Sequence, residues 1–241
     1  MVNTAAAFQG NPKAGPVGRI SPARSLSSCW RYSFRAIIFS NNAQVTKAIA
    51  EFQFDLHIAR GFFDVETCRD LLGELRRSSS RPALTYAKDN LGSVDEKVRK
   101  VARLMPSPET VAYVMRRLTA YRERIEEHFK VSLSVCEDPQ FLRYRVGDFF
   151  VAHQDGNTGL IRLDTDRSRR ISISIFLNHQ AESPEPNAYC GGSLVFSDWH
   201  NGAECRPACE AGTLVAFRSE VTHEIVPVTD GERYSIVSWY G

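Results

Sequence analysis

The sequence predicts an α+β fold in which an antiparallel β-barrel or sandwich carries helices on one outer face. Two helical stretches come first, and from residue 141 onward the chain changes to short strands separated by turns, with no helix between them. This segregation of helices and strands along a chain is typical of the α+β class. A chain of 241 residues with 43% hydrophobic residues is long enough to bury the core of one such domain.

Residues 51–140 are predicted to be mainly helical. Asp64 is placed to cap the first helix, because an aspartate side chain accepts hydrogen bonds from the free backbone N–H groups of a first turn. Ser107, followed by a proline, marks the start of a second helix that apolar residues at helical spacing continue to about Lys130. We interpret its apolar stripe as a packing surface.

Residues 141–241 are predicted to form the β-rich core. Short segments of apolar and small residues are interrupted by glycines and by an Asp-Gly turn, which are typical strand boundaries. The candidate strands are 141–146, 148–153, 171–177, 192–196, 213–217, 224–228 and 233–240.

Alternation in the 171–177 strand indicates which face points inward. Isoleucines at 171, 173 and 175 alternate with Ser172, Ser174 and Phe176. Isoleucines that pack on helices, with small polar residues toward a cavity, suit a barrel that holds a ligand. A half-exposed strand with its serines in water is the alternative.

Composition narrows the classes of function. Residues 1–50 carry six basic and no acidic residues, which leaves 24 basic and 28 acidic residues, a net charge of −4, in the rest of the chain. This distribution argues against a nucleic-acid binder, and no apolar run is long enough to span a membrane. We expect residues 1–50 to be a disordered extension, with an organellar targeting leader as the alternative, and the protein to be cytoplasmic. Residues 51–241 are expected to form a single domain.

The six cysteines are sparse for a chain of this length. Disulfide frameworks belong to short secreted proteins, so reduced thiols are expected. A zinc site at Cys190, Cys205 and Cys209 is the alternative, but it lacks a CxxC pair and a fourth ligand.

His153-Gln154-Asp155, with His223 further along the chain, forms the strongest chemical pattern. Residues two apart on a strand point to the same face, so His153 and Asp155 can reach one point. A second histidine from another strand completes two imidazoles and one carboxylate, which leaves three positions open on a metal. This ligand set suits non-haem Fe(II). An isolated HxD is also common by chance.

The last strand adds a cation. Alternation over 233–240 places Arg233, Ser235, Val237 and Trp239 on one face. If that face lines the metal pocket, the guanidinium of Arg233 is matched to the carboxylate of an organic acid. A surface ion pair of Arg233 with Glu232 or Asp230 is the alternative.

Four ordered motifs resemble Fe(II)/2-oxoglutarate dioxygenases of the prolyl-hydroxylase type. Residues 144–155 are similar to the family's Y-x-x-G…H-x-D segment, 169–178 to R-x-x-T…Y-L-N, 191–196 to G-G-x-x-x-F, and 222–239 to H-E…P-V…R-Y-x-I…W. Agreement of four motifs in order is far more specific than any one of them. The resemblance covers residues 141–241 and extends only loosely to 51–140.

The resemblance implies a double-stranded β-helix, or jelly-roll, core. It implies that His153, Asp155 and His223 bind Fe(II) and that Arg233 binds 2-oxoglutarate, with Tyr144 lining the same site. Phe176 stands where many relatives have a tyrosine that hydrogen-bonds the 2-oxoglutarate carboxylate.

Because Phe176 cannot donate a hydrogen bond, Ser235 or Ser172 is expected to supply it. Ser174, Phe176 and Trp239 are expected to line the pocket. Dioxygen is the implied co-substrate and ascorbate a candidate reductant.

Three functions follow from the sequence. The first is hydroxylation of a prolyl residue in a protein or peptide, with release of succinate and CO2. The second is hydroxylation of a free amino acid or small metabolite, and the third is a metal-binding jelly-roll module without oxygenase activity. Substrate contacts are expected from loops 156–170 and 178–190.

Overall fold

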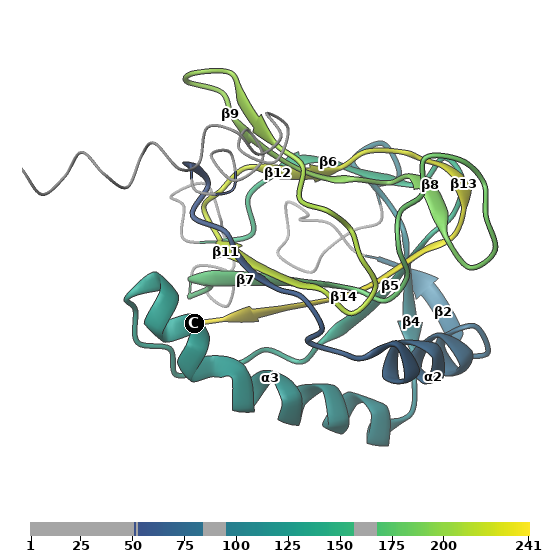
Figure 1. Cartoon of the computed structure of the whole chain (residues 1–241), viewed down its shortest axis with the longest axis horizontal. Coiled ribbons are helices and arrows are strands. Elements are labelled where there is room, and N and C mark those ends of the chain that lie inside the picture. The colour runs from purple at the N-terminus through teal and green to yellow at the C-terminus, as the bar shows by residue number, and fades with distance from the viewer. Residues whose placement is uncertain (1–50, 52, 84–94, 157–167) are drawn as a thin grey trace, which may run out of the picture. The chain divides into compact units, whose positions relative to one another are not determined.

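The computed structural model describes residues 51, 53–83, 95–156 and 168–241 (Figure 1). The prediction for residues 1–50 lies outside the described residues. The helices are α2 (Val65–Leu75) and α3 (Pro108–Phe129). The strands are β1 (His57–Ala59), β2 (Ser79–Pro82), β3 (Arg99–Lys100), β4 (Ala102–Met105), β5 (Gln140–Tyr144), β6 (Phe149–His153), β7 (Ile171–Phe176), β8 (Tyr189–Gly191), β9 (Leu194–Asp198), β10 (Ala203–Cys205), β11 (Leu214–Arg218), β12 (His223–Ile225), β13 (Val228–Gly231) and β14 (Arg233–Tyr240).

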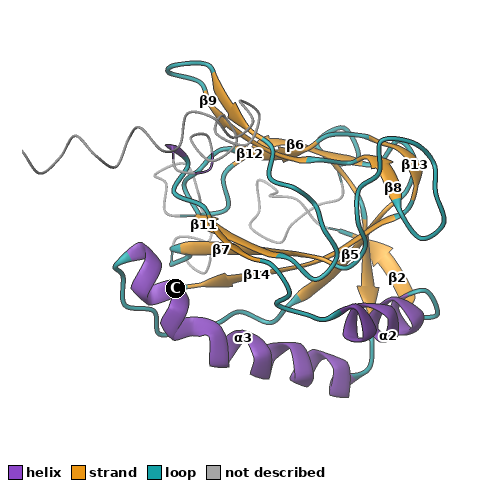
Figure 2. Ribbon diagram, viewed as in Figure 1, coloured by secondary structure: helices purple, strands orange, loops and turns teal. Residues whose placement is uncertain are grey.

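The strands form two main antiparallel sheets, consistent with the predicted jelly-roll. The larger sheet has the order β1-β11-β7-β14-β5-β4-β2 and the smaller sheet β10-β9-β12-β6-β3. A third sheet pairs β8 with β13. Figure 2 shows the two main sheets facing each other, with α2 and α3 on the outer face of the larger sheet, where the sequence placed its helices.

Both helices begin at the predicted caps. The Asp64 side chain accepts a hydrogen bond from the Thr67 backbone N–H, and the Ser107 side chain accepts one from the Thr110 N–H. Lys130 ends α3 in the left-handed conformation at φ 54°, which stops the helix as such caps commonly do.

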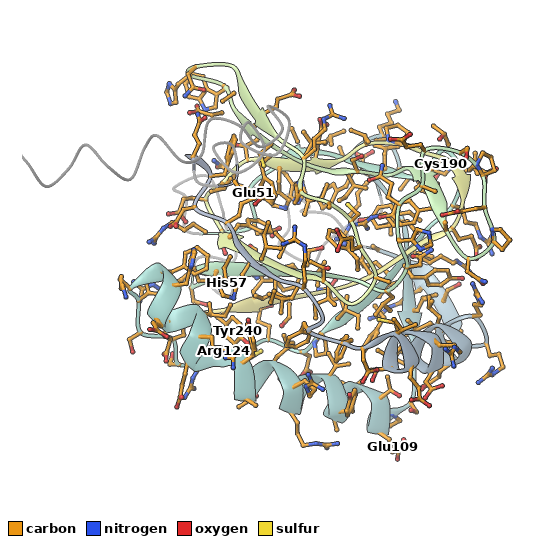
Figure 3. All side chains as sticks on the ribbon, viewed as in Figure 1. Glu51, His57, Glu109, Arg124, Cys190 and Tyr240 are labelled. Atoms are coloured by element: carbon orange, nitrogen blue, oxygen red, sulfur yellow. The ribbon has the colours of Figure 1, made fainter. Side chains whose placement is uncertain are left out.

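Two apolar clusters lie on opposite faces of the larger sheet. One packs the helices against the isoleucines of β7, and the other fills the space between the two main sheets and includes Phe176. The predicted alternation in this strand is therefore confirmed. Figure 3 shows Tyr240 between the larger sheet and α3, where its hydroxyl donates to the Leu118 carbonyl oxygen at 2.7 Å.

The region 51–140 differs from its prediction as mainly helical. Besides the two helices it contains β1, β2, β3 and β4, which extend the edges of both main sheets. These strands have two to four residues each, too short for a two-residue period to be recognised.

The predicted strand 224–228 is divided in two. Pro227, between β12 and β13, has no backbone N–H to donate to a neighbouring strand. Strands β8 and β10 were not predicted and have three residues each.

Two sequence expectations bear on the class of protein. Cysteines 68, 136, 190 and 209 are free thiols, as expected for reduced cysteines. Neither described helix combines the length and apolar character needed to cross a membrane.

Glu74 joins the two helices. Its carboxylate accepts hydrogen bonds from the Ser107 N–H at 2.6 Å and from the Thr110 hydroxyl. Burial alone would raise the pKa of Glu74, but these hydrogen bonds outweigh it and lower the pKa below 4.5. The charged carboxylate therefore stabilises the fold at neutral pH, and this contribution is lost as the pH falls through the folded-state pKa.

We expect Glu74→Gln to reduce the free energy of unfolding by about 1 kcal/mol at pH 7. The difference from the parent protein should shrink below pH 4.5, where the carboxylate takes up a proton. Urea unfolding at successive pH values measures this, with the exposed Glu123→Gln as the matched control. A difference that does not change with pH would contradict the role given to the charge.

Candidate metal and 2-oxoglutarate site

The structure brings the three predicted ligands together between the two main sheets. His153 ends β6 and lies directly opposite His223, the first residue of β12. The two Nε2 atoms lie 3.4 Å (His153) and 3.5 Å (His223) from the oxygens of Asp155. All three ligand atoms lie within 4.8 Å of one another, and no other such group occurs among the described residues. The zinc alternative at the cysteines is therefore not supported there.

Backbone carbonyls orient both imidazoles. Nδ1 of His153 donates to the Val151 carbonyl oxygen at 2.8 Å, and Nδ1 of His223 donates to that of Val221 at 3.0 Å. A carbonyl oxygen can only accept, so each Nδ1 carries the proton and each Nε2 keeps a free lone pair toward Asp155. This support of a metal-binding imidazole is common in proteins.

Gln154 and Ser219 join the turns that carry the ligands. The Gln154 side-chain amide donates to the Glu220 carbonyl oxygen at 2.7 Å, just before His223 in the chain. The backbone N–H of Asp155 donates to the Ser219 carbonyl oxygen at 2.9 Å. These bonds hold the two ligand-bearing segments together.

The electrostatics favour the metal-binding protonation states. Burial alone would raise the pKa of Asp155, but the His223 and His153 imidazoles outweigh it and hold the pKa well below its usual range. Burial, with His153 nearby, lowers the pKa of His223 to about 4. At neutral pH the site therefore offers the Asp155 carboxylate and a neutral His223 imidazole, which are the forms that bind metal. This donor set fits Fe(II) with open positions for other ligands.

A buried cation lies in the same interior. The side chain of Arg233 is 1% exposed, and its Nε has no hydrogen-bond partner among the described residues. Its guanidinium donates to the Ser235 hydroxyl at 2.9 Å and lies 5.0 Å from the centre of the Tyr144 ring. The surface ion pair with Glu232 does not form, since Glu232 binds Arg143 and Arg145 instead. A buried guanidinium without a carboxylate is costly, so the pocket fits a ligand that brings one.

Tyr189 is a further polar group that the sequence did not indicate. It is fully buried and its hydroxyl has no hydrogen-bond partner among the described residues. Burial raises its pKa, and the nearby Arg233 partly opposes the rise. Phe176 also lies beside Arg233, with its ring centre 5.5 Å from the guanidinium. Tyr189 on β8 thus places a phenol beside Arg233, where residue 176 has none.

The other predicted pocket residues lie along the inner face at different depths. Ser235 pairs with Phe176, and Ser174 pairs with Val237. Ser172 pairs with Trp239, four residues or about 13 Å along the strand from Phe176. The Ser172 hydroxyl bonds the Ser219 hydroxyl at 2.9 Å, near the Asp155 turn. The structure therefore brings Ser235, and not Ser172, to Arg233.

Gly192 leaves room for the Arg233 side chain. Its φ is +60°, and an added Cβ would lie 2.9 Å from Val228 Cγ2 and 3.2 Å from Arg233 Cδ. The second glycine of the predicted G-G motif is thus required both by backbone conformation and by contact.

Gly192→Ala is expected to lower the free energy of unfolding by about 2–4 kcal/mol, from a left-handed backbone cost of about 1–2 kcal/mol and crowding of about 1–3 kcal/mol. Gly202→Ala is the matched control, since its φ is +71° and no atom lies within 4 Å of the added Cβ. It should cost about 1 kcal/mol in the same denaturation experiment. Equal losses in the two variants would show that crowding beside Arg233 is unimportant.

Aromatic rings enclose the ligand cluster. The Phe150 ring stacks on His153 with centroids 3.5 Å apart, and Phe217 meets His223 edge-on at 4.6 Å. Sequence reasoning did not assign these residues or Gln154. Only the position of Gln154 within the HxD motif could have drawn attention to it. The part of loop 156–170 at 157–167 lies outside the described residues.

The carboxyl-terminal part matches a known family. Residues 139–241 match the family model described as the 2OG-Fe(II) oxygenase superfamily. A PKHD-type hydroxylase of Shewanella oneidensis is 37% identical over 106 residues, which are 42% of this chain and 41% of that protein. One from Burkholderia thailandensis is 36% identical over 102 residues, with the same coverage. The matched region thus spans about two fifths of the length of these relatives.

Solved structures share the fold. A Pseudomonas putida prolyl-4-hydroxylase aligns with a TM-score of 0.59 and 24% identity, over 81% of this chain and 96% of that one. A prolyl hydroxylase from Trichoplax adhaerens, solved with a hypoxia inducible factor peptide fragment, aligns with a TM-score of 0.58 and 15% identity, over 84% and 94%. At these identities the likeness establishes the jelly-roll fold.

Proposed function

We propose that the chain is an Fe(II)- and 2-oxoglutarate-dependent hydroxylase, from the match of residues 139–241 to the 2OG-Fe(II) oxygenase superfamily. The observation that carries the proposal is the presence, in one interior, of a two-histidine, one-carboxylate cluster and a buried guanidinium that has no carboxylate partner among the described residues. A metal-binding module without oxygenase activity would have no use for Arg233 in this position.

The described residues have distinct roles in this reaction. Fe(II) bound with 2-oxoglutarate supplies the oxidising chemistry that inserts one oxygen atom of O2 into a C–H bond, with release of succinate and CO2. His153, Asp155 and His223 would hold the metal from one side and leave its other positions accessible. Arg233 and Tyr189 would bind and orient the far carboxylate of 2-oxoglutarate.

Apolar side chains keep this interior dry. Phe196, Phe217 and Ile225 belong to the buried cluster between the two main sheets. Exclusion of water strengthens the interaction of Arg233 with a carboxylate and protects reactive species from side reactions.

We propose a prolyl residue in a protein or peptide as the substrate. The support is the likeness to PKHD-type hydroxylases in sequence and to prolyl hydroxylases in fold, one of them solved with a peptide. The alternative substrate is a free amino acid or another small metabolite. A requirement for ascorbate stays a prediction of the sequence.

The test has two parts. The protein purified without oxygen and given Fe(II), 2-oxoglutarate and then air should form succinate slowly without added substrate. A cell extract treated with the enzyme should then show proline residues that have gained one oxygen atom by peptide mass spectrometry. Oxygen found only in small molecules would overturn the peptide assignment, and absence of succinate would overturn the oxygenase assignment.

A further inference from the structure

Two arginines, the exposed Arg81 and the half-buried Arg103, lie opposite each other at one end of the larger sheet, outside the site described above. Arg81 on β2 lies directly opposite Arg103 on β4, and Arg103 lies opposite Leu142 on β5. Leu142 belongs to the cluster between the two main sheets, so both arginines lie on the face that carries Tyr144 and Arg233. Among the described residues neither has an ion pair with a carboxylate.

A third arginine connects this pair to the metal ligands. The guanidinium of Arg99 on β3 lies 4.7 Å from the centre of the Phe150 ring, and that ring stacks on His153. Arg99 is also close enough to Arg103 to repel it electrostatically. Arg99 therefore lies beside the ligand cluster, with Arg103 near Arg99 and Arg81 opposite Arg103 on the next strand.

The arrangement places like charges close together, and a bound anion would reduce their repulsion. Like charges directly opposite on neighbouring strands destabilise a sheet. Burial lowers the pKa of Arg103, and Arg81 and Arg99 lower it further, while the exposed Asp138 opposes them only in part. A charged residue on an edge strand commonly prevents that strand from pairing with another chain. This role would explain Arg81 on the edge strand β2, but not Arg103 on β4, the next strand inward.

We propose that Arg81 and Arg103, with Arg99 beside them, bind a carboxylate group of the substrate next to the carbon that is hydroxylated. This inference rests on the proposed function and gives its substrate an acidic character. A guanidinium matches a carboxylate in charge and geometry. The carboxylate can come from an acidic side chain that flanks a prolyl residue or from the α-carboxylate of a free amino acid.

The experiment measures binding rather than turnover. Labelled peptides of equal length with a central proline flanked by Glu, Gln or Lys are titrated with the full chain loaded with Fe(II) and 2-oxoglutarate without oxygen, and fluorescence anisotropy is recorded. The Glu peptide should bind about fivefold more tightly than the Gln peptide at low salt, and the preference should diminish at high salt. Arg81→Gln combined with Arg103→Gln should remove the preference.

The control is a second double variant that loses the same two positive charges, but from the opposite side of the larger sheet. Arg69→Gln with Arg116→Gln alters two exposed arginines on the outer helices α2 and α3 and should leave the preference intact. Free proline is titrated in the same way. If it binds, and if the double change at 81 and 103 lowers its affinity while the control variant does not, the carboxylate comes from the free amino acid.

Two results together would overturn the inference. The Glu and Gln peptides would bind with equal affinity, and the Arg81→Gln, Arg103→Gln variant would bind free proline as well as the parent protein does. Succinate formation by the unaltered chain is measured in parallel. If succinate forms but the peptides bind equally, the proposed function stands and the arginine site is wrong. If no succinate forms but the Glu peptide is preferred, the proposed function is wrong and the arginine site stands.

Discussion

His223→Ala is expected to weaken Fe(II) binding by at least about 100-fold and to abolish succinate formation. Changes to residues that merely support a ligand already cost about 10–100-fold in metal affinity, and this change removes a ligand. The metal content after anaerobic loading and the succinate yield measure the two effects. A thermal melt checks that the variant folds, because His223 is buried.

The matched control is His179→Ala. His179 lies in the loop between β7 and β8, where its ring contacts Glu185. Its removal should change neither metal content nor succinate yield. A His223→Ala protein that loads Fe(II) as well as the His179→Ala protein would show that the metal is bound elsewhere.

Arg233→Met is expected to weaken 2-oxoglutarate binding by about 100-fold, since removal of one partner of a buried charge pair costs about 2–5 kcal/mol. Without 2-oxoglutarate the variant should be as stable as the parent or more so, because it removes a buried cation that lacks a carboxylate. Tyr189→Phe should weaken binding by about tenfold through loss of one hydrogen bond to a charged group.

Calorimetric titration of 2-oxoglutarate into the Fe(II)-loaded proteins measures these affinities, and melting curves measure stability. Arg143→Met is the control, since Arg143 lies on β5 beside the same strand but interacts with Glu232. An unchanged affinity in Arg233→Met would remove Arg233 from the 2-oxoglutarate site.

Much of this architecture could be predicted because local signals were strong. Asp64 and Ser107 cap their helices as expected, and the six residues of β7 are enough for alternation to separate the face that packs on the helices from the inner face. Strands β1 to β4 carry no such period, and only their pairing with longer strands defines them.

The site was predictable in part for the same reason. The spacing of His153 and Asp155 follows from strand geometry, but the approach of His223 depends on the pairing of β6 with β12, which no local pattern encodes. Tyr189 was missed because it follows a long polar loop and joins Arg233 only through the fold. Ser172 was placed on the correct face but at the wrong depth for Arg233, because alternation defines the face and not the distance along the strand.

The hydrogen bonds of the two imidazoles have a consequence for metal selection. The carbonyl oxygens of Val151 and Val221 orient both rings, and Gln154 joins their segments, through hydrogen bonds that involve no metal. A site already arranged in this way offers the same three donors to manganese, cobalt, nickel or copper ions. Affinity for such donors generally rises from manganese through iron to copper. Occupancy by iron would therefore be set by which metals the surroundings supply, and inactive metals would compete for the protein without unfolding it.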